Sequence, residues 1–430
     1  MQNLCKSAKS VDKLFGHERH LETMASPIRI LTAVPICDGH DSAINTVNLE
    51  FIRHGIEVIY LGYHRSVGDI VRAAIQEDVR AIGISSYNGG HIEFFAEIVD
   101  LLRKKGADDI KVFGGGGGTI THEDGAIMKR KGVDEIFFAG TSLEEMVKFV
   151  HQRYGKPRGK RTRAKTLDME LAHKLSEIEE AAGKSKKHQT ASSAKAAKAA
   201  AAGSKIEHQT SRVVGFTGPG GVGKTTLIDE LVLRFLNQDR RSRIAILSHD
   251  PSVIGQGALL GDRATMINSQ NDRVFMRSMA TRGQAGGLSP ATHDCLALLA
   301  RSDFDYVFIE TVGTGQEAMP FRRSGIADLT ILVMNPDYGS RLQLQKIVML
   351  DLADIVVVNK SDLQRARTAH TEIEQRLDQN RRNQQLIDTV AKRHSDRGVD
   401  QLFALISQEA GAKRRKIKGN AGRRNSTTTR

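Results

Sequence analysis

The sequence predicts an α/β protein in which a flavodoxin-like (Rossmann-type) domain is joined by a flexible linker to a domain built around a phosphate-binding loop (P-loop). Three observations support this prediction. Strand-like apolar runs alternate with helical segments in residues 27–152, a glycine-rich loop follows an apolar run in residues 211–410, and a Lys/Ala-rich stretch lies in residues 153–210 between them. A length of 430 residues also exceeds what one hydrophobic core usually organises.

Five short apolar runs are the predicted strands of the first domain. They cover residues 28–34, 57–61, 81–85, 111–113 and 135–138. Amphipathic segments separate the runs, as expected for a doubly wound parallel sheet. Ligands of such sheets bind at the carboxyl ends of the strands. We therefore expect the loop after the first strand to lie near a ligand.

That loop contains Asp38 and His40. A carboxylate that fixes one imidazole nitrogen leaves the other nitrogen oriented toward a metal. A histidine without a second ligand at metal-binding spacing is more often structural or solvated. The residues alone leave both interpretations open.

The second domain begins with the most informative motif of the chain. Residues 218–225, Gly-Pro-Gly-Gly-Val-Gly-Lys-Thr, match GxxxxGK[ST] between a predicted strand at 213–217 and a predicted helix at 226–235. In such a loop the backbone N–H groups wrap a β-phosphate, the lysine reaches the β- and γ-phosphate oxygens, and the threonine hydroxyl binds Mg²⁺. Without this context the stretch would be an ordinary glycine-rich turn. The expected phosphate-binding residues are Gly218, Gly220, Gly221, Val222, Gly223, Lys224, Thr225 and Thr226.

Asn359, Lys360 and Asp362 form the predicted base-binding motif. Asp362 follows a predicted strand, where its carboxylate can accept hydrogen bonds from the N1–H and the exocyclic amine of guanine. Adenine offers no such pair of donors. In isolation the Asn-Lys-x-Asp pattern also fits a helix N-cap, but downstream of a P-loop it predicts GTP as the nucleotide.

Two further predicted strands end in carboxylates, Asp250 and Glu310. Both side chains are expected at the ligand-binding edge of the sheet, where they are candidate Mg²⁺ partners. Helix capping is the alternative role for each acid. Gly313 allows the backbone to approach the γ-phosphate closely, and Gln316 follows in the same loop.

The formal net charge of +13 comes from segments outside the predicted domains. Residues 413–430 carry eight basic side chains, residues 184–205 carry six lysines, and neither segment contains an acid. Aromatic residues make up only 5% of the chain, so sequence-specific nucleic-acid binding is not expected. We expect residues 1–26 to be a polar extension and residues 411–430 a disordered basic tail.

Cys5, Cys37 and Cys295 have neither the spacing of a zinc site nor that of a disulfide framework. No apolar run reaches the roughly 18 residues of a membrane span, and the N-terminus lacks the hydrophobic segment of a secretory signal. The sequence therefore predicts a cytoplasmic protein without a membrane partner.

Residues 211–410 resemble a known family in several motifs. GPGGVGKTT, HDPS, ALLGDRATM, ETVGTGQ and NKSD are similar to those of the GTPase chaperones of adenosylcobalamin-dependent acyl-CoA mutases, in the metallochaperone-like branch of P-loop GTPases. ETVGxGQ in place of DxxG is rather specific to that branch. The resemblance implies weak intrinsic GTP hydrolysis and a role in loading or protecting cobalamin. The catalytic residues that it implies are Lys224, Thr225, Glu310 and Gln316.

Residues 28–150 carry a second resemblance. The stretch from Asp38 to Ala43 is similar to the Asp-x-His-x-x-Gly fingerprint of cobalamin-binding domains, which implies His40 as the lower axial ligand of cobalt. The further cobalamin-binding residues that the resemblance implies, in a slot for the displaced nucleotide tail, are Ser85, Ser86, Tyr87, Gly114 and Gly115. Ala43 and Tyr87 depart from the glycine and the leucine of the family pattern.

The order of the two regions along the chain resembles that of the fused isobutyryl-CoA mutases, in which a cobalamin domain, a GTPase and a substrate barrel form one polypeptide. Such a barrel takes about 250 residues or more, whereas 68 residues follow Asp362. We therefore expect a GTPase that uses GTP and Mg²⁺ to handle adenosylcobalamin for an acyl-CoA mutase whose barrel lies on another chain or has been truncated away. A cobalamin-binding sensor GTPase and a corrinoid carrier for a methyltransferase are the alternatives.

Overall fold

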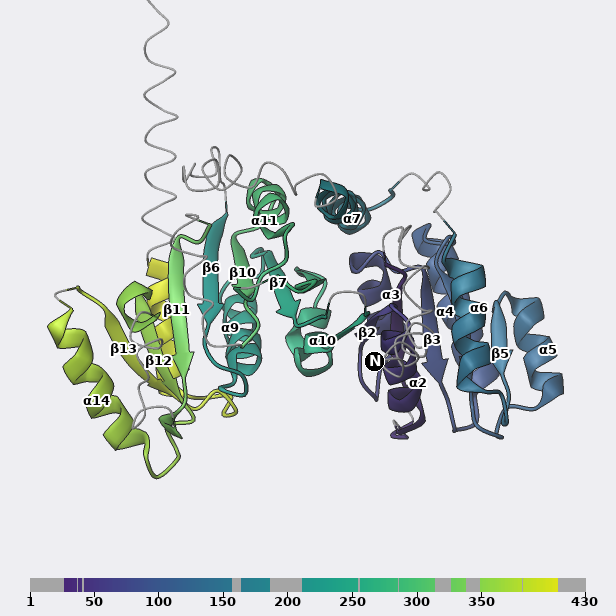
Figure 1. Ribbon diagram of the computed structural model, residues 1–430, viewed down its shortest axis with the longest axis horizontal. Helices are drawn as coiled ribbons and strands as arrows, with labels where there is room; N and C mark the ends of the chain where they lie inside the picture. Colours follow the sequence, from purple (N-terminus) through teal and green to yellow (C-terminus); the bar gives the residue numbers. More distant parts are fainter. Residues whose placement is uncertain are drawn as a thin grey trace, which may run out of the picture.

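The computed structural model shows two α/β regions side by side along the longest axis of the molecule (Figure 1). The first region covers residues 27–156 and the second residues 211–408, with one helix between them in sequence. No helix of the described residues is long and apolar enough to cross a membrane. The described residues are 27–36, 38–40, 42–156, 164–185, 211–253, 256–284, 286–313, 326–337, 349–380 and 382–408.

The first region is a parallel sheet covered by helices. Its strands are β1 (Arg29–Ala33), β2 (Glu57–Tyr60), β3 (Ala81–Ser85), β4 (Lys111–Gly115) and β5 (Glu135–Phe137). Its helices are α2 (Ser42–Arg53), α3 (Val67–Gln76), α4 (His91–Lys105), α5 (His122–Lys131) and α6 (Leu143–Tyr154). These five strands pair in the order β5-β4-β3-β1-β2, which is the flavodoxin-like order with its switch point between β1 and β3. The predicted fold class of this region is confirmed.

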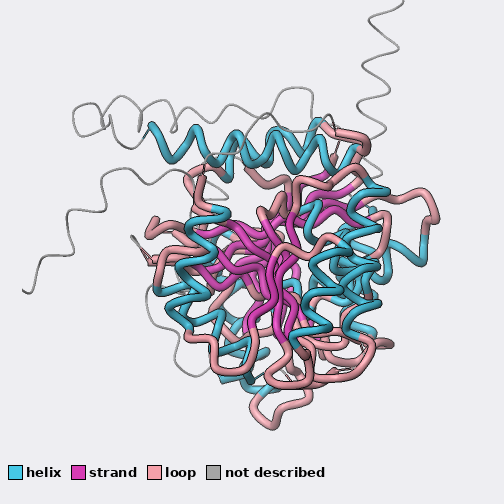
Figure 2. The backbone as a smooth tube through the Cα atoms, turned by 90° about the vertical axis from the view of Figure 1, so that its right-hand side faces the viewer, coloured by secondary structure: helices cyan, strands magenta, loops and turns pink. Residues whose placement is uncertain are grey.

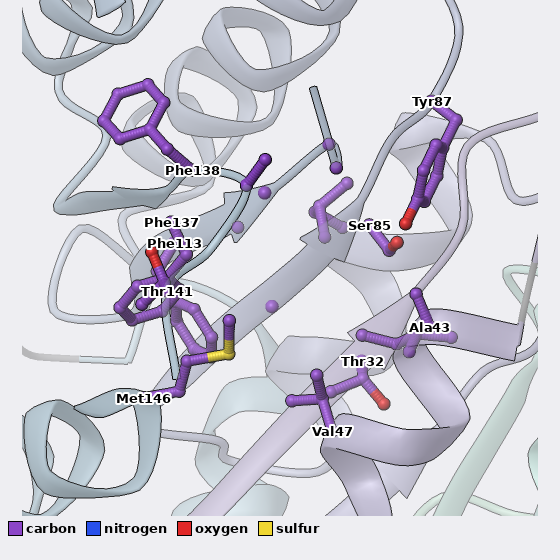
Figure 3. A pocket seen from close by; sticks show the side chains of 18 of the residues that line it. Thr32, Ala43, Val47, Ser85, Tyr87, Phe113, Phe137, Phe138, Thr141 and Met146 are labelled. Carbon is purple, nitrogen blue, oxygen red and sulfur yellow. The ribbon is translucent and has the colours of Figure 1, made fainter. Parts of the chain in front are cut away.

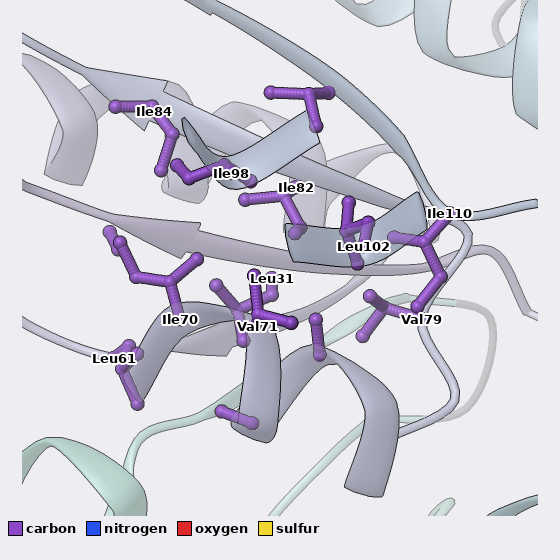
Figure 4. Close-up of a cluster of buried hydrophobic side chains, with 14 of the residues drawn as sticks. Leu31, Leu61, Ile70, Val71, Val79, Ile82, Ile84, Ile98, Leu102 and Ile110 are labelled. Atoms are coloured by element: carbon purple, nitrogen blue, oxygen red, sulfur yellow. The ribbon is translucent and has the colours of Figure 1, made fainter. Parts of the chain in front are cut away.

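Apolar residues at strand and helix spacing build the core of the first region. Every side chain of β1 and β3 is buried, as in the central strands of parallel sheets. Ile70 and Val71 of α3 share one buried cluster with Leu31 of β1 (Figure 4). The α3 helix begins at a polar cap, because the Ser66 hydroxyl accepts a hydrogen bond from the backbone N–H of Asp69.

The second region is a seven-stranded parallel sheet, and Figure 2 shows the strands of the molecule enclosed by helices. Across this sheet the strands are β13 (Gln385–Thr389), β12 (Ile355–Asn359), β11 (Leu329–Met334), β6 (Arg212–Thr217), β10 (Tyr306–Glu310), β7 (Ile244–Asp250) and β9 (Val274–Ala280). The helical segments are α9 (Lys224–Gln238), α10 (Asp262–Thr265), the 3₁₀ turn η3 (Ile267–Gln270), α11 (Thr292–Arg301), α14 (Ala366–Gln379) and a helix at 397–408. β6, which leads into the P-loop, lies at the centre of the sheet.

A short strand of the second region completes the first sheet. β8 (Ala258–Leu260) pairs in parallel with β2, with Glu57 opposite Ala258 and Ile59 opposite Leu260. Just before β8, the N–H of Gly257 donates to the carbonyl oxygen of Ile52 at 2.8 Å. The sequence contains no signal for this pairing, because an apolar run of three residues is too short to identify a strand.

Helix α7 (Leu167–Ser185) lies in the stretch that the sequence assigns to the linker. Leu171 and Leu175 are 3% and 0% exposed and share a buried cluster with Leu296 and Leu299 of α11. Residues 167–185 lie within the stretch that the sequence assigns to the linker, and in the structure one apolar face of this helix packs on the second region. The rest of the predicted linker, with the predicted extension and tail, lies almost entirely outside the described residues.

Candidate functional site

The P-loop joins β6 to α9 in a conformation that requires glycine at two positions. Gly218 has a φ of 142°, and a Cβ atom there would lie 2.0 Å from the carbonyl oxygen of Val333. Gly223 has a φ of 91°, and a Cβ atom there would lie 2.5 Å from Nδ2 of Asn359. The loop is therefore enclosed by β11 and by the end of β12.

Lys224 and Thr225 begin helix α9. Lys224 is 7% exposed, and its Nζ donates to the carbonyl oxygens of Gly218 at 2.9 Å and Pro219 at 3.2 Å. The Thr225 hydroxyl donates to Oε1 of Glu310 at 2.8 Å. A cation and a hydroxyl thus stand at a helix N-terminus, where the helix dipole also favours an anionic ligand.

Three carboxylates lie close enough to affect one another's charge: Asp250 at the end of β7, Glu310 at the end of β10 and Asp262 at the start of α10. Burial, together with the negative charge of Asp262, raises the pKa of Glu310 to about 8. Burial and the charges of Asp262 and Glu310 also raise the pKa of Asp250 well above its ordinary value. Like charges in a buried site repel one another, and a cation would relieve that repulsion.

The donor set fits a magnesium ion that is bound together with a nucleotide. Oε2 of Glu310 is buried and has no hydrogen-bond partner among the described residues, so it is a candidate ligand. In the part of the chain that the structure describes, no group of three or more His, Cys, Asp or Glu side chains could hold a metal ion alone. Mg²⁺ usually takes one or two protein carboxylates and completes its octahedron with water and phosphate oxygens. Thr225, Asp250 and Glu310 are compatible with that arrangement.

His249, near the end of β7, holds the backbone of this site through hydrogen bonds of its imidazole ring. Its Nδ1 donates to the carbonyl oxygen of Glu310 at 2.9 Å, and its Nε2 lies 2.8 Å from the hydroxyl of Thr292. Burial lowers the pKa of His249 to about 4. The imidazole is therefore neutral at pH 7, and it holds the end of β10 through hydrogen bonds.

The predicted base-binding motif lies against the P-loop. The Asn359 amide donates from Nδ2 to the carbonyl oxygen of Val222 at 2.8 Å, and its Oδ1 accepts from the N–H of Ala391 at 3.0 Å. Lys360 has a φ of 59°, and its Nζ donates to the carbonyl oxygen of Gly221 at 2.7 Å. The loop after β12 is thereby fixed to the phosphate loop.

Asp362 reaches toward a second loop rather than toward the P-loop. Its Oδ2 pairs with Nζ of Lys392 at 2.6 Å, and the hydrogen bond from Lys392 lowers the pKa of the carboxyl group. Lys392 and Ala391 follow β13, whose Thr389 hydroxyl also donates to Asn359 at 3.0 Å. The structure therefore adds the segment after β13 to the candidate base site, a segment that carries no motif in the sequence.

Gly313, after β10, touches the P-loop directly. The N–H of Gly220 donates to its carbonyl oxygen at 2.8 Å, and a Cβ atom at Gly313 would lie 2.3 Å from the Gly220 nitrogen. A side chain at position 313 would push the two loops apart. Gln316, predicted as catalytic in the same loop, lies outside the described residues.

Asp38 and His40 lie at the carboxyl end of β1. Asp38 is fully buried, and its Oδ1 accepts hydrogen bonds from the backbone N–H of His40 at 3.0 Å and from Nδ1 of His40 at 2.8 Å. Its Oδ2 accepts from the backbone N–H of Tyr87. Burial alone would raise the pKa of Asp38, but these hydrogen bonds hold it below its ordinary value. The His40 side chain is 70% exposed and keeps Nε2 as the nitrogen for a ligand.

A cavity of about 210 Å³ lies between the first sheet and helices α2 and α6. Ala43 and Val47 of α2 line one side, and Phe137 and Met146 line the other (Figure 3). Residues 114–117 line it from the end of β4. The cavity is mainly apolar and open at the carboxyl edge of the sheet, which suits an elongated organic group.

Two glycines beside the cavity have no space for a side chain. A Cβ atom at Gly114 would lie 2.2 Å from the carbonyl oxygen of Ile84, and one at Gly116 would lie 2.2 Å from the carbonyl oxygen of Ser86. The chain therefore passes close to the ends of β3 and β4 at these positions, which only glycine allows. Among the predicted cobalamin-binding residues, those that line the cavity are Ser85, Tyr87, Gly114 and Gly115. Ser86 is buried but does not line it.

A family model described as "Methylmalonyl Co-A mutase-associated GTPase MeaB" matches residues 171–429. The chain belongs to this MeaB family. A second family model, the B12 binding domain, matches residues 28–148. This MeaB-family chain thus joins a GTPase of the mutase-associated type to a cobalamin-binding domain, as its sequence motifs predict. The MeaB match begins inside α7, the helix that packs on the GTPase sheet.

Curated relatives of this MeaB-family chain contain both regions. The chain is 37% identical to a fused isobutyryl-CoA mutase of Geobacillus kaustophilus over 90% of its own length, and 38% identical to one of Cupriavidus metallidurans over 92%. In both cases the match covers 37% of the relative. The chain therefore spans little more than a third of the length of these relatives.

Proposed function

We propose that this MeaB-family chain hydrolyses GTP in its second region and uses that cycle to load or protect adenosylcobalamin, held in its first region, for an acyl-CoA mutase. The observation that carries the proposal is the presence of both family domains, a B12-binding domain and a mutase-associated GTPase, in one chain. The names of the curated relatives support the link to a mutase. The mutase barrel would come from a separate subunit or domain.

In the nucleotide site, the backbone of residues 218–223 would bind the phosphates and the ammonium of Lys224 would compensate their charge. Lys224 now donates to carbonyl oxygens of its own loop, so its ammonium is already positioned over the loop. Thr225, Asp250 and Glu310 would hold Mg²⁺, with Asp262 as a nearby carboxylate. The magnesium would neutralise charge that develops between the β- and γ-phosphates.

Guanine selection would rest on Asp362. Its carboxylate is oriented by Lys392 and held deprotonated, which is the state that accepts two N–H donors from one base edge. Asn359 and Lys360 would act by fixing this loop against the P-loop.

In the first region, His40 would hold cobalt through Nε2, because Asp38 engages Nδ1. The mainly apolar cavity beside residues 114–117 would take the displaced nucleotide tail. Bound adenosylcobalamin supplies a weak cobalt–carbon bond that serves mutases as a radical source. This chain's residues would bind the cofactor, orient the imidazole and keep the tail out of water.

The first experiment tests the nucleotide site. Lys224→Ala and Thr225→Ala should each abolish most GTP hydrolysis by the full chain, because one removes phosphate charge compensation and the other a Mg²⁺ ligand. Cobalamin binding should persist in both variants, because the P-loop belongs to the second region and the proposed cobalt ligand His40 to the first. Hydrolysis at the parent rate in either variant would contradict the proposed site.

The second experiment separates a mutase function from a sensor function, in which cobalamin binding merely regulates the GTPase. The chain, loaded with adenosylcobalamin, is mixed with a separate mutase substrate subunit and an acyl-CoA such as isobutyryl-CoA. Isomerised product is expected only if the chain serves a mutase. GTP turnover that responds to cobalamin, with no product under any subunit combination, would favour the sensor.

A further inference from the structure

Two loops that follow β7 and β9 are joined by a ladder of hydrogen bonds. The N–H of Thr281 donates to the carbonyl oxygen of Asp250 at 3.1 Å, and the N–H of Ser252 donates to the Thr281 hydroxyl at 3.1 Å. The N–H of Arg282 then donates to the Ser252 hydroxyl at 2.7 Å, and the N–H of Gly283 to the Ser252 carbonyl at 3.0 Å. The backbone of Asp250 is therefore coupled to the backbone of Arg282.

Arg282 is held in a conformation that a residue with a side chain rarely adopts. Its φ is 50°, in the left-handed region, and such strain persists only where surrounding contacts impose it. The backbone of Arg282 is held by Ser252, and its side chain is held by the cobalamin-binding region, where Nε and Nη2 donate to Oε1 of Glu57 at 3.3 and 3.2 Å. Nη2 also lies 3.7 Å from Oε2 of Glu179. Glu57 is 3% exposed, and its other oxygen accepts from Arg29 at 3.1 Å.

A second segment connects Asp250 to the same strand of the cobalamin-binding region. Oδ2 of Asp250 accepts the N–H of Gly261 at 3.1 Å, and Gly261 directly follows β8, which is hydrogen-bonded to β2. The chain before β8 lies so close to the first region that a Cβ atom at Gly257 would be 1.9 Å from the carbonyl oxygen of Ile56. Both the carboxylate and the backbone of Asp250 are therefore anchored on β2, the strand that begins with Glu57.

We propose that Glu57 of the cobalamin-binding region is a positioning residue for the magnesium–nucleotide site, acting through Arg282 on Asp250. This inference rests on the proposed role of Asp250 in that site. The GTPase is then complete only when the cobalamin-binding region is docked through β2. Because coupling between two sites is reciprocal, occupancy of the nucleotide site must equally bias the position of β2 in the first sheet.

The Arg282–Glu57 pair joins the first region to one of the two loops that hold Asp250, and two other ion pairs between the regions attach elsewhere. Glu77 of the first region pairs with Arg263 at 2.6 Å in a fully buried cluster that connects to α10 and β9. Arg72 of α3 pairs with Asp272, which lies at the opposite end of β9 from Arg282. The Arg72–Asp272 pair crosses the same boundary and touches neither loop, so it provides a matched control.

The test measures the Mg²⁺ concentration that gives half-maximal GTP hydrolysis by the full chain, and the affinity for GTP in EDTA. Arg282→Gly removes the guanidinium while keeping a residue that accepts the positive φ. Arg282→Gly and Glu57→Gln are expected to raise the half-saturating Mg²⁺ concentration by about tenfold or more, as when the partner of a metal ligand is lost. Arg282→Lys, which keeps a cation for Glu57, should recover part of the loss. GTP affinity without Mg²⁺ should stay within about twofold.

Asp272→Ala should leave the Mg²⁺ dependence within about twofold of the parent, although it removes a contact between the regions. An unchanged Mg²⁺ dependence in Arg282→Gly would overturn the inference, as would an equal shift in Asp272→Ala. Arg282→Gly decides the matter if Glu57→Gln does not fold. Asp250→Asn distinguishes a failure of the inference from a failure of the proposed function. If Asp250→Asn keeps the parent's Mg²⁺ dependence, Asp250 is not part of the metal site, and the inference about Glu57 is then wrong as well.

Discussion

Truncation of Leu175 to alanine tests whether α7 is part of the GTPase core. Leu175 is fully buried beside Phe275 and Leu299, so the change removes atoms that water does not reach. Buried leucine-to-alanine changes cost about 2–5 kcal/mol in free energy of unfolding, from lost transfer energy and from the cavity left behind. Leu167 on the same helix is 39% exposed, and Leu167→Ala should cost no more than about 1 kcal/mol.

Urea unfolding followed by far-UV circular dichroism compares the two variants, since the chain contains no tryptophan for fluorescence. With a denaturant slope of about 1–3 kcal/mol per molar urea, Leu175→Ala should lower the midpoint of the GTPase transition by roughly 1 M or more. Bound GTP should raise that midpoint in parent and variant alike, which identifies the transition. Equal midpoints for Leu175→Ala and Leu167→Ala would refute the packing of α7 on the second region.

Three further predictions concern the sites and their pH dependence. Asp362→Asn should move nucleotide preference from GTP toward xanthosine triphosphate, which carries a carbonyl in place of the guanine amine; an unchanged ratio in competition binding would contradict the guanine assignment. In full chain enriched with ¹⁵N-histidine, reduced Co(II) cobalamin should show nitrogen hyperfine coupling that His40→Ala abolishes, and Asp38→Ala should weaken cofactor binding by about 10–100-fold; coupling that persists in His40→Ala would rule out this ligand. Because burial lowers the pKa of His249 to about 4, the unfolded chain binds more protons than the folded chain below about pH 6.5, and stability should fall as the pH drops from about 6.5 toward 4. In His249→Gln, the urea midpoint should fall less than in the parent between about pH 6.5 and pH 4. If the midpoints of variant and parent depend on pH in the same way, His249 is not a buried neutral imidazole.

Local sequence patterns were sufficient to predict the five strands β1 to β5, the P-loop strand and the loops that carry the candidate sites. The five strands of the first sheet and the P-loop strand depend on short apolar runs, which are visible in any window of a few residues. Parallel strands end at one edge, so placing Asp38 after β1 and Glu310 at the end of β10 needed no tertiary information. The glycine requirement at Gly218 and Gly223 likewise follows from the motif and appears in the structure as positive φ angles.

The sequence by itself therefore determined the two family domains, the nucleotide class and the positions of Asp38 and His40, because each depends on residues close together in the chain. Only the tertiary structure decided that α7 packs on the GTPase sheet and that β8 extends the cobalamin-binding sheet. It also brought Asp262 to Glu310 and Arg282 to Glu57, pairs separated by 48 and 225 residues. An apolar helix face, the edge strand of a sheet and a buried carboxylate are each stable only beside a partner. Local periodicity does not say which distant segment of the chain supplies that partner.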